Sequence, residues 1–196
     1  NIRVCLERFE ERDDYRGVFV DAPTAQDLVT SETLLIICDV SNPAAFESQS
    51  LYECVRTCVI IDHHRKIAEF EREPLIAYIE PSASSASELV SEILEISALG
   101  QGALGSIKLS RHEANVMLAG IMLDTKNFTR STGTRTFAAA LYLRGEGGNA
   151  EIASTFFNED GSYTAPEFYE MSDFSSWGIP DSLEMKPEIT APGGNI

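Results

Sequence analysis

The chain has 196 residues, enough for one ordinary domain, and its hydrophobic content of 43% is enough to build a core. Its formal net charge of −16 disfavours long nucleic acids, because an acidic surface repels polynucleotide phosphates. No apolar run approaches the roughly 20 residues of a membrane-spanning helix, so we expect no membrane segment here, although a parent protein can be anchored elsewhere. The 4 cysteines show no C-x-x-C spacing, which indicates a reducing, cytoplasmic setting.

In chain order, the apolar pattern predicts alternating helices and strands. The expected strands cover 34–39, 58–62 and 75–79, and the expected helices cover 7–15, 24–28, 51–56, 84–97, 110–123 and 135–143. The first two strands are continuous apolar runs ending in aspartate, which is typical of parallel strands buried on both faces. We therefore expect an α/β domain over 1–158, with a mainly parallel sheet flanked by helices. Residues 159–196 contain 4 prolines and should form an irregular C-terminal extension or linker.

Three positions have the character of metal ligands, namely Asp39, His63 and Asp124. Each follows an apolar segment, and the carboxyl ends of parallel strands are where ligands collect in open α/β sheets. Two carboxylates and an imidazole favour Mn²⁺, with Mg²⁺ as a poorer match. A single aspartate after a strand is more often a cap or turn residue. For His63, which stands beside His64 and after Asp62, an ordinary structural role stays open but is the less favoured explanation.

Two polar stretches could contact a phosphate. Residues 125–136 are rich in hydroxyls and carry Lys126, Arg130 and Arg135 in an otherwise acidic chain, as a phosphodiester substrate requires. Serines within 82–87 could present hydroxyls and helix N-terminal amides to an anion. The alternatives are a polar loop for the first stretch and ordinary helix capping for the second.

Four separated motifs resemble one enzyme family. Residues 59–65 (Val-Ile-Ile-Asp-His-His-Arg) resemble the motif that names the DHH phosphoesterases. Residues 80–90 (Glu-Pro-Ser-Ala-Ser-Ser-Ala-Ser-Glu-Leu-Val), 119–129 (Ala-Gly-Ile-Met-Leu-Asp-Thr-Lys-Asn-Phe-Thr) and 132–144 (Thr-Gly-Thr-Arg-Thr-Phe-Ala-Ala-Ala-Leu-Tyr-Leu-Arg) resemble the catalytic region of the GdpP-type cyclic-di-AMP phosphodiesterases. The resemblance covers roughly residues 2–157.

The resemblance implies a two-manganese site that hydrolyses cyclic-di-AMP to the linear dinucleotide pApA in bacterial second-messenger signalling. Asp39 would bridge both metals, while His63 and Asp124 would complete the second. Asp62 would orient its neighbours, and His64 would lie near the scissile phosphate. The substrate contacts that we expect are Ser84, Ser85, Thr132, Gly133 and Arg135.

Two parts of the family pattern have no counterpart in this sequence. The first motif, a histidine and two aspartates on an earlier strand, would precede Asn1, and residues 159–196 do not resemble the companion DHHA1 domain. We therefore expect little hydrolysis of cyclic-di-AMP by this chain as it stands. Two alternatives stay open: an oligonucleotide hydrolase of the RecJ-like branch, and a non-catalytic domain that binds a nucleotide or a partner protein. A homodimer is compatible with the sequence.

Overall fold

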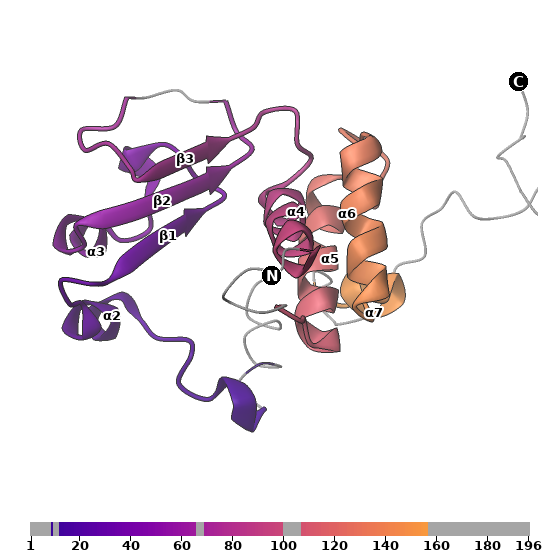
Figure 1. Cartoon of the computed structure of the whole chain (residues 1–196), viewed down its shortest axis with the longest axis horizontal. Helices are drawn as coiled ribbons and strands as arrows, with labels where there is room; N and C mark the ends of the chain where they lie inside the picture. The colour runs from indigo at the N-terminus through magenta and orange to yellow at the C-terminus, as the bar shows by residue number, and fades with distance from the viewer. Residues whose placement is uncertain (1–8, 10–11, 66–68, 100–106, 157–196) are drawn as a thin grey trace, which may run out of the picture. The chain divides into compact units, whose positions relative to one another are not determined.

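The structure is a computed structural model that describes residues 9, 12–65, 69–99 and 107–156. Its sheet has three parallel strands in the order β1-β2-β3, formed by β1 (Leu34–Cys38), β2 (Thr57–Asp62) and β3 (Ile76–Ile79). Figure 1 shows the three strands side by side and pointing in the same direction. The predicted α/β fold with a parallel sheet is confirmed. The predicted extension 159–196 lies outside the described residues, and the domain boundary stays a prediction.

Helices connect and follow the strands, mostly where the apolar pattern predicts them. They are α2 (Ala22–Leu28), α3 (Gln49–Cys54), α4 (Ala86–Leu99), α5 (Arg111–Asp124), α6 (Thr134–Gly145) and α7 (Ala150–Ser154), with 3₁₀ helices η1 (Asp13–Tyr15) and η2 (Pro43–Ala45). The helix expected over 7–15 lies partly outside the described residues, and its described end is η1. Within the described chain, no helix is long and apolar enough to cross a membrane.

Local hydrogen bonds explain where two of the helices begin. A capping box at Ser110 begins α5, since Ser110 N–H donates to Glu113 Oε2 at 2.7 Å and Glu113 N–H donates to Ser110 Oγ at 3.2 Å. The sequence analysis missed α7. Its start is fixed by the Asn149 side chain, which accepts hydrogen bonds from Glu151 N–H and Ile152 N–H.

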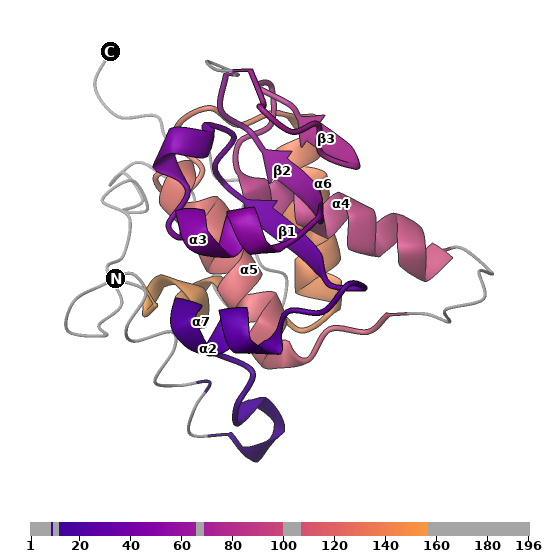
Figure 2. The same ribbon diagram turned by 90° about the vertical axis from the view of Figure 1, so that its left-hand side faces the viewer.

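The central strand β2 is the most buried part of the sheet. Helix α4 packs against one face, where Leu89 contacts Ile61 and Ala83 in a buried cluster. A second core lies among the helices α5, α6 and α7, which pack together (Figures 1 and 2) and bury Ile121 and Leu143 completely. This arrangement holds the carboxyl ends of the strands beside the helices.

Strand β1 differs from the prediction in its burial. The apolar run 34–38 was expected to be buried on both faces, but Leu34 and Ile36 are 47% and 56% exposed. The prediction was wrong because exposure alternates along β1: Leu34 and Ile36 share one face, which the described chain leaves uncovered, whereas Leu35 and Ile37 on the other face are partly buried.

Candidate metal centre

The ends of β1 and β2 bring Asp39 next to Asp62 and His63. Cys38 is the register partner of Ile61, and Asp39 N–H donates to the Ile61 carbonyl at 2.9 Å. Asp39 then turns out of the strand with φ of 65°, a left-handed conformation that aspartate tolerates better than most residues. We call the edge formed by these strand ends the carboxyl edge.

His63 lies between two carboxylates at the carboxyl edge. Its Nε2 atom is 3.3 Å from Asp39 Oδ1 and 3.7 Å from Asp124 Oδ2, and Asp124 is the last residue of α5. The structure thus brings together the three residues predicted as ligands. Burial and the neighbouring Asp39 charge raise the pKa of Asp124, with His63 and His64 acting in the opposite direction. A cation here would relieve this repulsion, so the residues present suit a divalent metal ion.

His64 is a second possible neighbour of such an ion. One ligand atom each from Asp39, His63 and His64 lie within 4.8 Å of one another. However, His64 Nδ1 is only 2.8 Å from Asp62 Oδ1, and an ionised carboxylate can only accept a hydrogen bond. Nδ1 therefore carries a proton and cannot bind a metal. His64 Nε2 stays available, while Asp124, whose Oδ2 atom lies 3.7 Å from His63 Nε2, is the third ligand that the sequence predicts.

Asp62 is fully buried although it is a carboxylic acid. Burial raises its pKa, but the Ser41 side chain and His64 lower it by more, so the pKa lies below the ordinary value and Asp62 stays ionised. The hydrogen bond from Asp62 likewise raises the pKa of His64. In the described chain, Asp62 Oδ2 has no hydrogen-bond partner. Asp62 is therefore placed where it can orient His64, and its role in the site stays a prediction.

A pocket of about 290 Å³ opens beside these residues. Asp39 and Asp124 form one side, and the start of α4, including Ser87, forms another. Helices α4 and α5 are very close there, since a Cβ atom on Gly120 would lie 2.2 Å from Ser87 Oγ. Sequence reasoning did not single out Ser87, although it belongs to the serine-rich stretch that it did select.

The predicted substrate residues lie in two different settings. The hydroxyls of Ser84 and Ser85 are buried and already used: Ser84 Oγ–H donates to Glu88 Oε2 at 2.6 Å, and Ser85 Oγ accepts from Glu88 N–H at 3.1 Å. Thr132 and Gly133 lie just before α6, where Gly133 N–H donates to Thr136 Oγ1 at 3.0 Å. Substrate contact by these residues stays a prediction.

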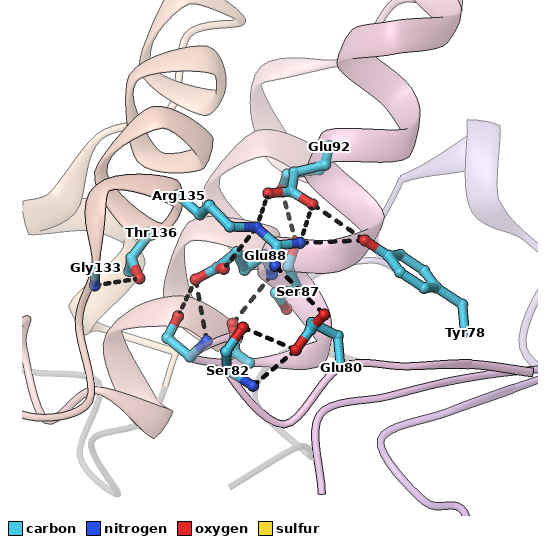
Figure 3. A network of polar contacts seen from close by, with 12 residues as sticks. Tyr78, Glu80, Ser82, Ser87, Glu88, Glu92, Gly133, Arg135 and Thr136 are labelled. Carbon is cyan, nitrogen blue, oxygen red and sulfur yellow. Dashed lines mark hydrogen bonds and ion pairs between the residues drawn. The ribbon is translucent and has the colours of Figure 1, made fainter.

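Arg135, in the first turn of α6, is held by side chains from other elements (Figure 3). Its Nε and Nη2 atoms donate to the two carboxylate oxygens of Glu92 at 2.7 and 2.6 Å, and Nη2 also donates to Tyr78 Oη at 3.1 Å. Sequence reasoning missed Glu88 and Glu92. The signal available for Glu88 was the S-x-x-E spacing from Ser85, a capping pattern at the start of α4.

The loop after Asp124 has an unusual backbone. Lys126, Asn127 and Phe128 follow one another with φ of 49°, 55° and 63°, a left-handed conformation that costs about 1–2 kcal/mol per residue. Buried Thr125 holds this loop, because its Oγ1 atom donates to the Ile121 carbonyl at 2.7 Å and accepts from Phe128 N–H at 2.9 Å. Strain that is maintained next to a candidate ligand is typical of functional sites.

Sequence comparisons show that the chain is similar to part of several bacterial cyclic-di-AMP phosphodiesterases. It is 40% identical over 154 residues to the cyclic-di-AMP phosphodiesterase GdpP of Geobacillus thermodenitrificans, which covers 79% of this chain and 22% of that protein. Identity is 40% over 141 residues to GdpP of Bacillus subtilis, covering 72% of the chain and 20% of that protein. Identity is 37% over 160 residues to the cyclic-di-AMP phosphodiesterase PdeA of Listeria monocytogenes, covering 82% of this chain and 23% of that protein. The chain thus spans less than a quarter of the length of these relatives.

Solved structures support the same fold. An exopolyphosphatase-related protein from Bacteroides fragilis matches with a TM-score of 0.57 at 22% identity, over 74% of this chain and 40% of that one. A putative family II inorganic pyrophosphatase from Methanococcus jannaschii matches with a TM-score of 0.50 at 23% identity, over 65% of this chain and 41% of that one. The DHH family, N-terminal domain, matches residues 4–121. Since that match covers more than half of the chain, this protein belongs to the DHH family.

Proposed function

We propose that this domain hydrolyses a phosphodiester bond of cyclic-di-AMP to give the linear dinucleotide pApA, with Mn²⁺ as the preferred cation. The observation that carries the proposal is that the carboxylates of Asp39 and Asp124 both lie within 3.7 Å of His63 Nε2. The similarity of 37–40% to three cyclic-di-AMP phosphodiesterases supports the choice of substrate. The net charge of −16 supports a small dinucleotide over a long strand.

In such a reaction, we expect some side chains to bind the cation and others to contact the phosphate. Asp39, His63 and Asp124 would hold the cation, whose positive charge stabilises the charge that develops on a reacting phosphate. Asp62 fixes the proton on His64 Nδ1 through the 2.8 Å contact and so points Nε2 away from itself. Because Asp62 also raises the pKa of His64, a larger fraction of His64 is protonated and can donate a hydrogen bond to a phosphate oxygen.

The described residues offer ligands for one cation, and a two-manganese reaction needs more. We therefore expect low turnover from this chain as it stands, but binding of cyclic-di-AMP that depends on Mn²⁺. Binding should be measured by calorimetry with Mn²⁺ and with EDTA, in the wild type and in His63→Ala. Cyclic-di-AMP, the linear dinucleotide and a single-stranded oligonucleotide should be compared, and products identified by chromatography.

The expected result is Mn²⁺-dependent binding of cyclic-di-AMP that His63→Ala abolishes. Binding that persists unchanged in EDTA or in His63→Ala would contradict the proposed metal centre. A clear preference for the oligonucleotide would contradict the proposed substrate and favour the RecJ-like alternative. Binding with no dependence on metal and no product would favour a non-catalytic nucleotide-binding domain.

A further inference from the structure

Arg135 belongs to a group of charged and polar side chains that joins three elements of the fold. The guanidinium comes from α6, its hydrogen-bond partners Glu92 and Tyr78 come from α4 and β3, and the carboxylates of Glu80 and Glu88 each lie 3.9 Å from it. We call Tyr78, Glu80, Glu88, Glu92 and Arg135 the Arg135 network (Figure 3). These contacts link residues that are 43 and 57 positions apart in sequence.

Two carboxylates of the network hold the turn that leads into α4, residues 82–87, which we call the serine turn. Glu80 Oε1 accepts from Ser82 N–H at 3.0 Å and from Ser82 Oγ–H at 2.8 Å. Fully buried Glu88 accepts from Ser84 N–H at 3.1 Å and from Ser84 Oγ–H at 2.6 Å through Oε2. The serine turn is thus attached at Ser82 and at Ser84 to carboxylates that face Arg135.

The serine turn also reaches the candidate metal centre. Ala86 and Ser87, where the turn enters α4, line the pocket that Asp39 and Asp124 line from the other side. Two residues before the turn, Glu80 N–H donates to the Asp62 carbonyl at 2.9 Å, which ties the segment leading into the turn to the end of β2. A displacement of the turn would therefore change the geometry around Asp39, Asp62 and Asp124.

Arg135 supplies the cation that three carboxylates of this group require. Glu88 Oε1 is buried without a hydrogen-bond partner, and the Arg135 guanidinium at 3.9 Å is the positive charge that faces it. The hydrogen bonds from Arg135 hold the pKa of Glu92 below its usual range. Loss of the guanidinium would leave Glu88 buried without this compensation, which is costly in a protein interior.

From these contacts we infer that Arg135 is a positioning residue, which holds the serine turn against the metal centre instead of contacting the substrate. Most of its donors are directed to Glu92 and Tyr78, both of this protein, and a bidentate pair fixes the orientation of the guanidinium plane although the Arg135 side chain is 39% exposed. The inference rests on the proposed function for its chemical meaning. Its first test does not depend on activity.

That test is amide hydrogen exchange of the metal-free chain, with Arg135→Gln, Glu92→Gln and the double variant. A positioning role predicts that each single variant accelerates exchange in the serine turn about 10-fold, the effect of losing a charged hydrogen bond. Exchange in α5 should stay unchanged, and the double variant should exceed neither single variant by much, because both break the same contact. Arg135→Lys keeps the charge without the bidentate pair and should have a smaller effect.

Arg144→Gln is the matched control, since Arg144 lies on the same helix but donates to the Gly148 carbonyl at 2.7 Å. It should leave the serine turn unchanged. Two results would overturn the inference: unchanged exchange of the serine turn in Arg135→Gln, or equal acceleration throughout α5 and α7, as expected of a general structural brace. If Arg135→Gln does not fold, Glu92→Gln and Tyr78→Phe test the same contacts from the partner side.

A second measurement separates positioning from substrate contact. With Mn²⁺ present, Glu92→Gln and Arg135→Gln should weaken binding of cyclic-di-AMP by a similar factor if Arg135 acts through the serine turn. Weaker binding in Arg135→Gln with normal binding in Glu92→Gln would make Arg135 a substrate contact and overturn the inference. Absence of Mn²⁺-dependent binding by the wild type would count against the proposed function alone, and the exchange data would then decide.

Discussion

Replacement of Asp39 by asparagine should stabilise the metal-free protein. The carboxylates of Asp39 and Asp124 both lie within 3.7 Å of His63 Nε2, so their nearest oxygens are about 7 Å or less apart. Two like charges at this distance repel by about 0.6 kcal/mol in water and by about 2.4 kcal/mol at an effective dielectric constant of 20. Because the Asp39 side chain is 57% exposed, we expect the lower end, about 0.6–1 kcal/mol. Asparagine also tolerates the left-handed φ of this position.

The same substitution should remove the response to Mn²⁺. A ligand that binds only the folded state raises the free energy of unfolding by RT ln(1 + [L]/Kd), about 2.7 kcal/mol at 100 times Kd. The wild type should therefore gain stability from Mn²⁺, whereas Asp39→Asn should gain little. Urea denaturation at about pH 8, above the ordinary range of histidine titration, with EDTA or with Mn²⁺, measures both effects.

Asp27→Asn is the matched control, because Asp27 is an exposed carboxylate on α2. It makes the same chemical change and should keep the full response to Mn²⁺. The reasoning is refuted if Mn²⁺ stabilises Asp39→Asn as much as the wild type. A metal-free Asp39→Asn that is less stable than the wild type would refute the repulsion argument and leave the assignment of ligands to be judged by the metal response.

Three further predictions concern the surroundings of the site. Gly120→Ala should lower the free energy of unfolding, measured by urea denaturation, by about 1 kcal/mol net, because overpacking against Ser87 costs more than the gain in helix propensity. The double variant with Ser87→Ala should recover part of this loss. Lys126→Gly should raise the free energy of unfolding by up to about 1 kcal/mol by relieving the left-handed backbone, and thermal unfolding would show a lower Tm if this is wrong. Arg135 lowers the pKa of Glu92, so the Glu92 carboxylate binds protons more readily in the unfolded chain than in the folded one. Glu92 should therefore stabilise the fold above about pH 4.3, and this stabilisation should be lost as the pH falls through the lower pKa of the folded state. Glu92→Gln should weaken this pH dependence when the free energy of unfolding is measured across the acid range.

The sheet and the position of the candidate ligands at its carboxyl edge were predictable because their signals are local. An apolar run that ends in Asp39, and a second that ends in Asp62 and His63, fix both the strands and the edge where their polar ends meet. The exposure of Leu34 and Ile36 was not predictable, since it depends on what covers that face of β1 and not on its own sequence.

The Arg135 network was not predictable for a related reason. Arg135 and Glu92 are 43 residues apart, and no periodicity connects a helix start with the middle of another helix. Ser84 and Ser85 show the same limit, because hydroxyls at a helix start can face either a ligand or the helix itself. In this structure both hydroxyls face the helix itself, because they hydrogen-bond to the buried Glu88.

Asp62 and Glu88 are carboxylates whose burial is poorly explained by stability alone. Both are fully buried carboxylates, and each has one oxygen without a hydrogen-bond partner in the described chain. Apolar residues of similar size would often give a fold of equal or greater stability, so such carboxylates are poorly explained by stability alone. Asp62 contacts His64 at the carboxyl edge, and Glu88 accepts hydrogen bonds from Ser84 in the serine turn. The cost of burying them is therefore concentrated around Asp39, His63 and Asp124, as expected if this edge is where the chemistry takes place.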